Sequence, residues 1–165
     1  MGEPLGMAAK KRYWLMKSEP SDYSIDDLER DGKEPWDGIR NYQARNIMRD
    51  EMSIGDEVLF YHSNADPPGV AGIAKVASKA YPDHTAWDKK NKHFDKRSTP
   101  ENPVWLMVDV EFVEKFPHLV SLPEIKEEEA LAEMMVTKRG MRLSVQPVDG
   151  AHFRKIRSMG RRKKK

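Results

Sequence analysis

The sequence contains no cysteine, which excludes disulfide bonds, thiolate metal sites and cysteine nucleophiles. Its 165 residues include no apolar run long enough to cross a membrane, and the N-terminus has no secretory apolar segment. We therefore expect an intracellular protein without membrane attachment, in the cytoplasm or, in a eukaryote, the nucleus. This length suits one domain with an adequate core, and we expect a monomer.

Sequence motifs of common enzymes are absent as well. There is no G-x-S-x-G elbow, no Walker loop and no H-E-x-x-H, and the five histidines never have the spacing of helical metal ligands. We therefore expect no metal, no cofactor and no enzymatic activity. His62 could serve as a general base, because histidine titrates near neutrality. A single histidine at a strand end is more often structural.

Charge is distributed unevenly along the chain. From Arg154 onward there are eight basic residues and no acidic ones, which leaves 21 basic against 27 acidic residues, a net charge of −6, in the preceding part. A nucleic-acid-binding domain usually has a basic face on its body. The basic end is either a solvated, disordered tail or a source of salt-sensitive phosphate affinity, and the sequence favours neither.

Apolar periodicity and turn residues predict an α+β fold. The predicted strands span residues 13–18, 58–62, 70–81, 104–113 and 142–146, the last ended by Pro147. Capping residues predict helices at 24–31, 42–49, 121–135 and 149–158. Small residues in the third strand indicate a close approach by another backbone or a ligand. We expect a small mixed β-barrel, or a strongly curved sheet, of five to six strands flanked by short helices.

Polar and aromatic residues gather where the predicted strands end. Lys17 and Ser18 end the first strand, Trp36 precedes a helix start, and Tyr61 to Asn64 end the second strand. If the sheet closes into a barrel, these ends meet at one mouth, which would suit a flat polar ligand such as a nucleobase. The alternative is that each polar group satisfies the backbone of a neighbouring loop.

The order of several motifs resembles the EVE domain, a family of the PUA-like superfamily related to YTH and ASCH domains. The motifs are YWLMKSEP at 13–20, WDGIRNYQARN at 36–46, FYHSN at 60–64, GVAG at 69–72, YPD at 81–83, VDVEF at 108–112 and RLSVQP at 142–147. The resemblance covers residues 13 to about 157, and we expect a single domain at 12–158, with 1–11 as a flexible leader and 159–165 as a basic disordered tail. It implies a PUA-like barrel that reads a modified base, such as methylated or hydroxymethylated cytosine, in DNA or RNA.

The resemblance also implies roles for individual residues. Trp36 would stack on a flipped base, while Ser18 and Asp37 would bind its edge. Further residues would line the base pocket: Lys17, Tyr61, His62, Ser63 and, as a second aromatic, Trp87. Phosphate or sugar contacts would come from Arg40, Asn41, Tyr42 and Arg45, although Asn41 also suits a helix cap.

Two other classes of function stay open at this level. The long loop at 82–103 could be the docking surface of a protein-interaction module, and the acidic body favours this reading because its field does not attract nucleic acid. An enzyme that processes nucleic acid, with His62 as its base, is the weaker alternative.

Overall fold

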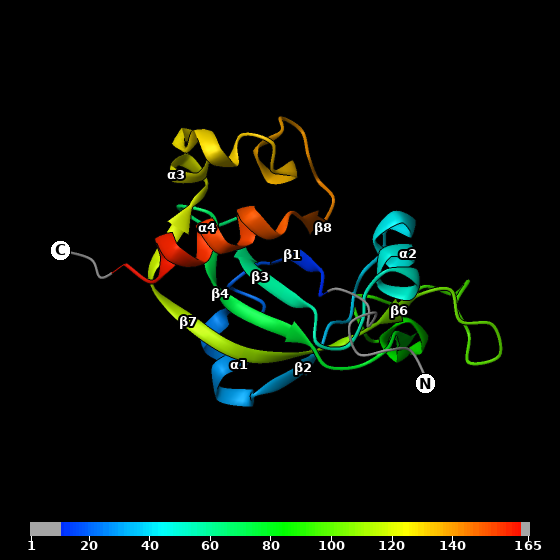
Figure 1. Cartoon of the computed structure of the whole chain (residues 1–165). Helices are drawn as coiled ribbons and strands as arrows, with labels where there is room; N and C mark the ends of the chain where they lie inside the picture. The colour runs from blue at the N-terminus through cyan, green and yellow to red at the C-terminus, as the bar shows by residue number, and fades with distance from the viewer. Residues whose placement is uncertain (1–10, 163–165) are drawn as a thin grey trace, which may run out of the picture.

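A six-stranded sheet, curled into a half-barrel, is the centre of the computed structural model, which describes residues 11–162 (Figure 1). The strands are β1 (Tyr13–Ser18), β2 (Lys33–Pro35), β3 (Glu57–His62), β4 (Gly69–Val76), β7 (Asp109–Ser121) and β8 (Val145–Val148), with β5 (Tyr81–Pro82) and β6 (Leu106–Met107) as a separate pair. The α-helices are α1 (Ile25–Asp31), α2 (Tyr42–Asp50), α3 (Leu122–Glu127) and α4 (Gly150–Gly160). The predicted α+β class and curved sheet are confirmed. Most of the predicted leader, residues 1–10, and the last three tail residues, 163–165, lie outside the described residues.

The strand order places the C-terminal ends of β1 and β3 side by side. The order is β2-β7-β4-β3-β1-β8, and the pairing of β1 with β3 is parallel while the other neighbours are antiparallel. Parallel strands end at the same edge, so Ser18 lies beside His62. The predicted meeting of strand ends follows from this pairing.

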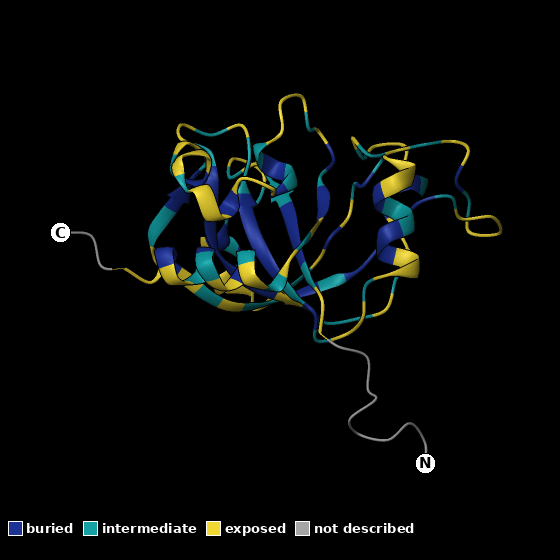
Figure 2. Cartoon of the chain, turned by 45° about the horizontal axis from the view of Figure 1, so that its top comes forward, coloured by how far each residue is buried: buried dark blue, intermediate teal, exposed yellow. Residues whose placement is uncertain are grey.

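The core lies on both faces of the sheet, because successive side chains of a strand point in opposite directions. Trp14, Met16 and Phe60 pack with α1 and α2 on one face, whereas Leu15 and Leu59 pack with α3 and α4 on the other. Figure 2 shows the inner strands as buried, with exposed residues on the outer surfaces of the helices. The sheet therefore separates two hydrophobic layers, and Trp36 belongs to the first.

Glycines in β4 allow close contact with β7, as the small residues of this strand predict. A Cβ atom on Gly72 would lie 2.3 Å from the backbone oxygen of Glu114, and one on Gly69 would lie 2.4 Å from that of Val120. The register of the two strands shifts between Val70 and Gly72 and again after Ile73. Such bulges bend a strand and thereby help the sheet to curl.

We expect Gly72→Ala to lower the free energy of unfolding by about 2 kcal/mol, because the added methyl group must push two backbones apart. Urea denaturation of the purified variant measures the loss. Gly150→Ala is the matched control, since its added Cβ would meet side chains rather than backbone, namely the end of Arg154 at 3.1 Å and the Tyr13 ring at 3.2 Å. Equal stabilities of the two variants would contradict the tight β4–β7 contact.

Several predicted strand boundaries are wrong, and the last strand begins at Val145 rather than at residue 142. β4 ends at Val76 rather than residue 81, and the predicted strand 104–113 is two strands, of which β7 continues to Ser121. The chain changes sheets at Val108, where β6 pairs with β5 and β7 pairs with β4. Pro147 lies within β8 rather than ending it, which an edge strand tolerates because no outer neighbour needs its N–H.

Two helix boundaries also differ from the predictions. The helix predicted at 121–135 stops at Glu127 and continues as short 3-10 turns, because Glu127, Glu128 and Glu129 put negative charge at its C-terminal end. The last helix extends to Gly160, so the tail does not begin at 159: Met159 is buried and helical. The capping boxes at Ser24 and Ser121 and the Asn41 cap are confirmed. None of the helices formed by residues 11–162 is both long and apolar enough to cross a membrane.

Candidate nucleobase pocket

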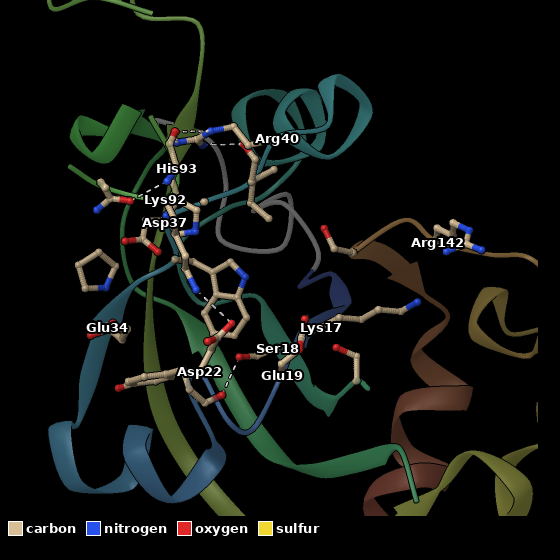
Figure 3. Close-up of a pocket in the computed structure, with 18 of the residues that line it drawn as sticks. Lys17, Ser18, Glu19, Asp22, Glu34, Asp37, Arg40, Lys92, His93 and Arg142 are labelled. Carbon is tan, nitrogen blue, oxygen red and sulfur yellow. Dashed lines mark hydrogen bonds and ion pairs between the residues drawn. The ribbon is translucent and has the colours of Figure 1, made fainter. Parts of the chain in front are cut away.

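A pocket of about 1120 Å³ opens at the edge where β1 and β3 end. Six of the predicted site residues line it: Lys17, Ser18, Trp36, Asp37, Arg40 and Ser63. They come from three separate parts of the chain, namely the end of β1, the turn after β2 and the residue after β3 (Figure 3). The pocket is large enough for a nucleobase.

Trp36 forms part of the pocket wall and of the core at once. Its side chain is only 7 % exposed, and its ring is perpendicular to that of Phe60, with the centroids 5.4 Å apart. The backbone N–H of Trp36 donates to the Val108 carbonyl, which fixes this part of the backbone beside the start of β7. The indole is therefore rigidly held and presents a small apolar area to the pocket.

Two carboxylates of the pocket lining, those of Glu34 and Asp37, have pKa values above the usual range. Burial raises the pKa of Asp37, although His93 partly offsets this effect, and burial together with the charge of Asp37 raises the pKa of Glu34. Within residues 11–162, neither of these two side chains forms a hydrogen bond. Both can therefore accept a hydrogen bond from a ligand's amino group.

The end of β1 contributes a mostly polar wall. The Lys17 ammonium donates to the Met141 carbonyl at 3.2 Å, and burial lowers its pKa. The Ser18 hydroxyl donates to the Tyr23 carbonyl at 2.6 Å, which leaves its oxygen able to accept. The Ser63 N–H donates to the Ser18 carbonyl and ties the ends of β1 and β3 together.

Arg40 holds the pocket wall to the loop that follows β5. Its guanidinium donates to the Asp83 carboxylate at 3.0 Å and to the His93 carbonyl at 2.7 Å. Asp83 is fully buried and also accepts from the Gly38 N–H and from Thr85. Burial raises the pKa of Asp83, but the hydrogen bonds from Thr85, Gly38 and Arg40 outweigh this effect and hold that pKa below its usual range.

The other predicted phosphate-binding residues lie outside the pocket lining. Asn41 caps α2 by accepting from the Ala44 N–H. Tyr42 stacks on Trp105, with ring centroids 4.8 Å apart, and Arg45 lies over the Tyr42 ring and donates to the Val104 carbonyl. These side chains connect α2 to the segment before β6.

Three predicted pocket residues also lie elsewhere. Tyr61 is buried on the opposite face of the sheet, although Lys17 approaches its ring to 5.9 Å. The His62 Nε2 accepts from the Ile25 N–H at the start of α1, and burial lowers the pKa of this imidazole. Trp87 is half-buried in a 3-10 turn and does not line the pocket.

The lining also contains residues that the sequence did not single out. They are chiefly Tyr23, Glu34, Lys90, Lys92, His93 and Arg142. His93 packs directly on the turn, because a Cβ atom on Gly38 would lie 2.6 Å from its ring. The unusual length of the loop 82–103 was the available signal for part of this set. Residues 11–162 contain no group of three or more histidine, aspartate or glutamate side chains that could hold a metal.

Comparison with known proteins gives a consistent result. The model of the EVE domain family matches residues 12–159. Human thymocyte nuclear protein 1 is 42 % identical over 86 % of this chain and 70 % of its own length. A hypothetical protein from Leishmania major superimposes with a TM-score of 0.86 at 50 % identity, covering 92 % of this chain and 95 % of that one. Human THYN1 in complex with DNA containing 5-methylcytosine gives 0.85 at 39 % identity, covering 93 % and 100 %.

Proposed function

This chain belongs to the EVE domain family, and we propose that it binds a modified cytosine of DNA, flipped out of its strand into the pocket beside Trp36. The observation that carries the proposal is the pocket itself, where an aromatic side chain lies between hydrogen-bond acceptors and donors. The complex of human THYN1 with DNA containing 5-methylcytosine supports this choice of ligand. Binding, rather than catalysis, accounts for the groups that line the pocket.

The chemistry of the lining suits the edge of cytosine. Cytosine offers an amino donor next to two acceptors, a ring nitrogen and a carbonyl oxygen. Asp37 and Glu34 can accept from the amino group, and Lys17 can donate to an acceptor. Asp37 and Trp36 both line the pocket, so the Asp37 carboxylate can reach the edge of a base that lies against the indole. A 5-methyl group adds apolar area that can pack against Trp36 or Ile39.

Flipping a nucleotide costs a few kcal/mol of lost stacking, which pocket contacts must offset. A single-stranded substrate lowers this cost, so short single strands are suitable probes. Labelled DNA and RNA oligonucleotides with one cytosine, 5-methylcytosine, 5-hydroxymethylcytosine or thymine are titrated with the protein and followed by fluorescence anisotropy. We expect tight binding of a modified cytosine in DNA that persists at higher salt. Equal, weak and salt-sensitive binding of every oligonucleotide would contradict the proposal and favour a protein partner.

Asp37→Ala tests the contact with the base edge. We expect it to weaken binding of the preferred oligonucleotide by about 10- to 100-fold, because a hydrogen bond to a charged group is lost. Asp50→Ala is the control, since this aspartate is exposed on α2 and lies outside the pocket lining. If both variants bind as the unchanged protein does, Asp37 does not read the base.

A further inference from the structure

The cationic side chains around the pocket fall into two groups. The first group is Arg40 and Arg45, which were predicted to bind phosphate. Their guanidinium groups instead donate hydrogen bonds to carbonyl and carboxylate groups of the protein. Lys90 and Arg142 are exposed at the pocket, and their side chains form no hydrogen bond or ion pair within residues 11–162. The second group is therefore better suited to an external anion.

The segments that carry Lys90 and Arg142 are locally basic. Residues 88–97 contain five basic and two acidic residues, and residues 138–142 contain three basic and no acidic ones. Both acidic residues of the first segment are engaged: Asp88 accepts from the Lys90 N–H, and Asp95 binds Arg97 and Trp105. The acidic character of the body as a whole therefore does not extend to these two segments.

These two segments lie on different sides of the pocket. Figure 3 shows Lys92, from the loop after β5, and Arg142, from the segment before β8, separated by the pocket between them. Lys92 pairs with Asp22 at 3.3 Å, but both side chains are more than half exposed, so this ion pair is weak. A phosphate can replace Asp22 as its partner at little cost.

A nucleotide whose base enters the pocket has one phosphate on its 5′ side and one on its 3′ side. A strand that crosses the mouth between the two basic segments brings one phosphate to each. We propose that the DNA strand crosses the pocket mouth from the basic segment 88–97 to the basic segment 138–142, with Lys90 and Arg142 each binding one phosphate that flanks the inserted nucleotide. This inference rests on the proposed function and assigns the backbone contacts of the same site. Glu34 and Asp37 would then face the base rather than the backbone.

The salt dependence of binding tests this assignment. For a single strand, the slope of log affinity against log salt concentration changes by about 0.7 for each phosphate contact. We expect Lys90→Gln and Arg142→Gln each to reduce the slope by about 0.7 and the double variant by about 1.4. The ratio of affinities for modified and unmodified oligonucleotides should stay within twofold of its original value, because phosphate contacts do not read the base.

Lys126→Gln is the matched control, because Lys126 is exposed on α3, outside the pocket, and its loss changes the net charge equally. Its slope should equal that of the unchanged protein. If the Lys90 and Arg142 variants also keep the original slope while selective binding persists, the crossing path is wrong and the proposed function stands. If the unchanged protein itself shows no preference for a modified base, the proposed function fails, and this path fails with it.

Discussion

Asp83→Ala is expected to lower the free energy of unfolding by about 2–4 kcal/mol. This fully buried carboxylate accepts from the Gly38 N–H, the Arg40 guanidinium and Thr85, so its removal leaves several donors without a partner. The range allows for Arg40, whose side chain remains 23 % exposed and can recruit water. Chemical denaturation followed by circular dichroism gives the value.

The control for this variant is Asp50→Ala, which removes an aspartate that also pairs with an arginine. The Asp50 and Arg49 side chains are 55 % and 48 % exposed, so we expect Asp50→Ala to lower the free energy of unfolding by no more than about 0.5 kcal/mol. If the two variants were equally stable, the hydrogen bonds of Asp83 would not be what holds the pocket wall to the loop after β5.

The stabilising effect of Asp83 should also depend on pH. Its folded-state pKa lies below the unfolded value, so its ionised form stabilises the fold above about pH 4, and this contribution is lost as the pH falls through the folded-state pKa. Asp83→Asn lacks this titration. The stability difference between the unchanged protein and Asp83→Asn should therefore be largest near neutral pH and shrink below pH 4. A difference that stays constant down to pH 3 would rule out this contribution.

Local signals in the sequence predicted much of the fold. Capping at Ser24, Asn41 and Ser121 involves residues three positions apart, so it can be read without knowledge of the tertiary structure. The small residues of β4 indicated a close backbone contact, although not the strand that makes it. The end of β7 was missed because Phe116 to Ser121 interrupt the alternation with Pro117 and His118.

The pocket was predictable only in part, for a similar reason. The ends of β1 and β3 meet because the strands are parallel neighbours, and the motifs located those ends. The partners of Arg40 lie 43 and 53 residues away, in a loop without periodicity, so nothing local indicated that its donors are used within the protein. For the same reason, the sequence alone did not indicate that Lys90 and Arg142 line the pocket, because both lie in segments whose position depends on the tertiary structure.

Replacement of Trp36 should have the largest effect on binding. Base stacking on an aromatic side chain is worth about 1–3 kcal/mol, so Trp36→Leu should weaken binding of the modified oligonucleotide by about 5- to 150-fold. Leucine is preferred to alanine here because Trp36 is only 7 % exposed, and truncation to alanine would cost about 3–5 kcal/mol of folding stability. Anisotropy titration at a temperature where the variant is fully folded measures the affinity.

Trp14→Leu separates stacking from core packing. Trp14 is 2 % exposed, belongs to the same hydrophobic cluster as Trp36 and lies outside the pocket lining. Trp14→Leu should reduce stability at least as much as Trp36→Leu, because the hydrogen bond from the Trp14 indole N–H to Asp56 is also lost. It should nevertheless leave the preference for the modified base unchanged. If both tryptophan variants lose binding in proportion to their lost stability, Trp36 acts only through the core. If Trp36→Leu alone loses the preference, its indole is the surface on which the base stacks.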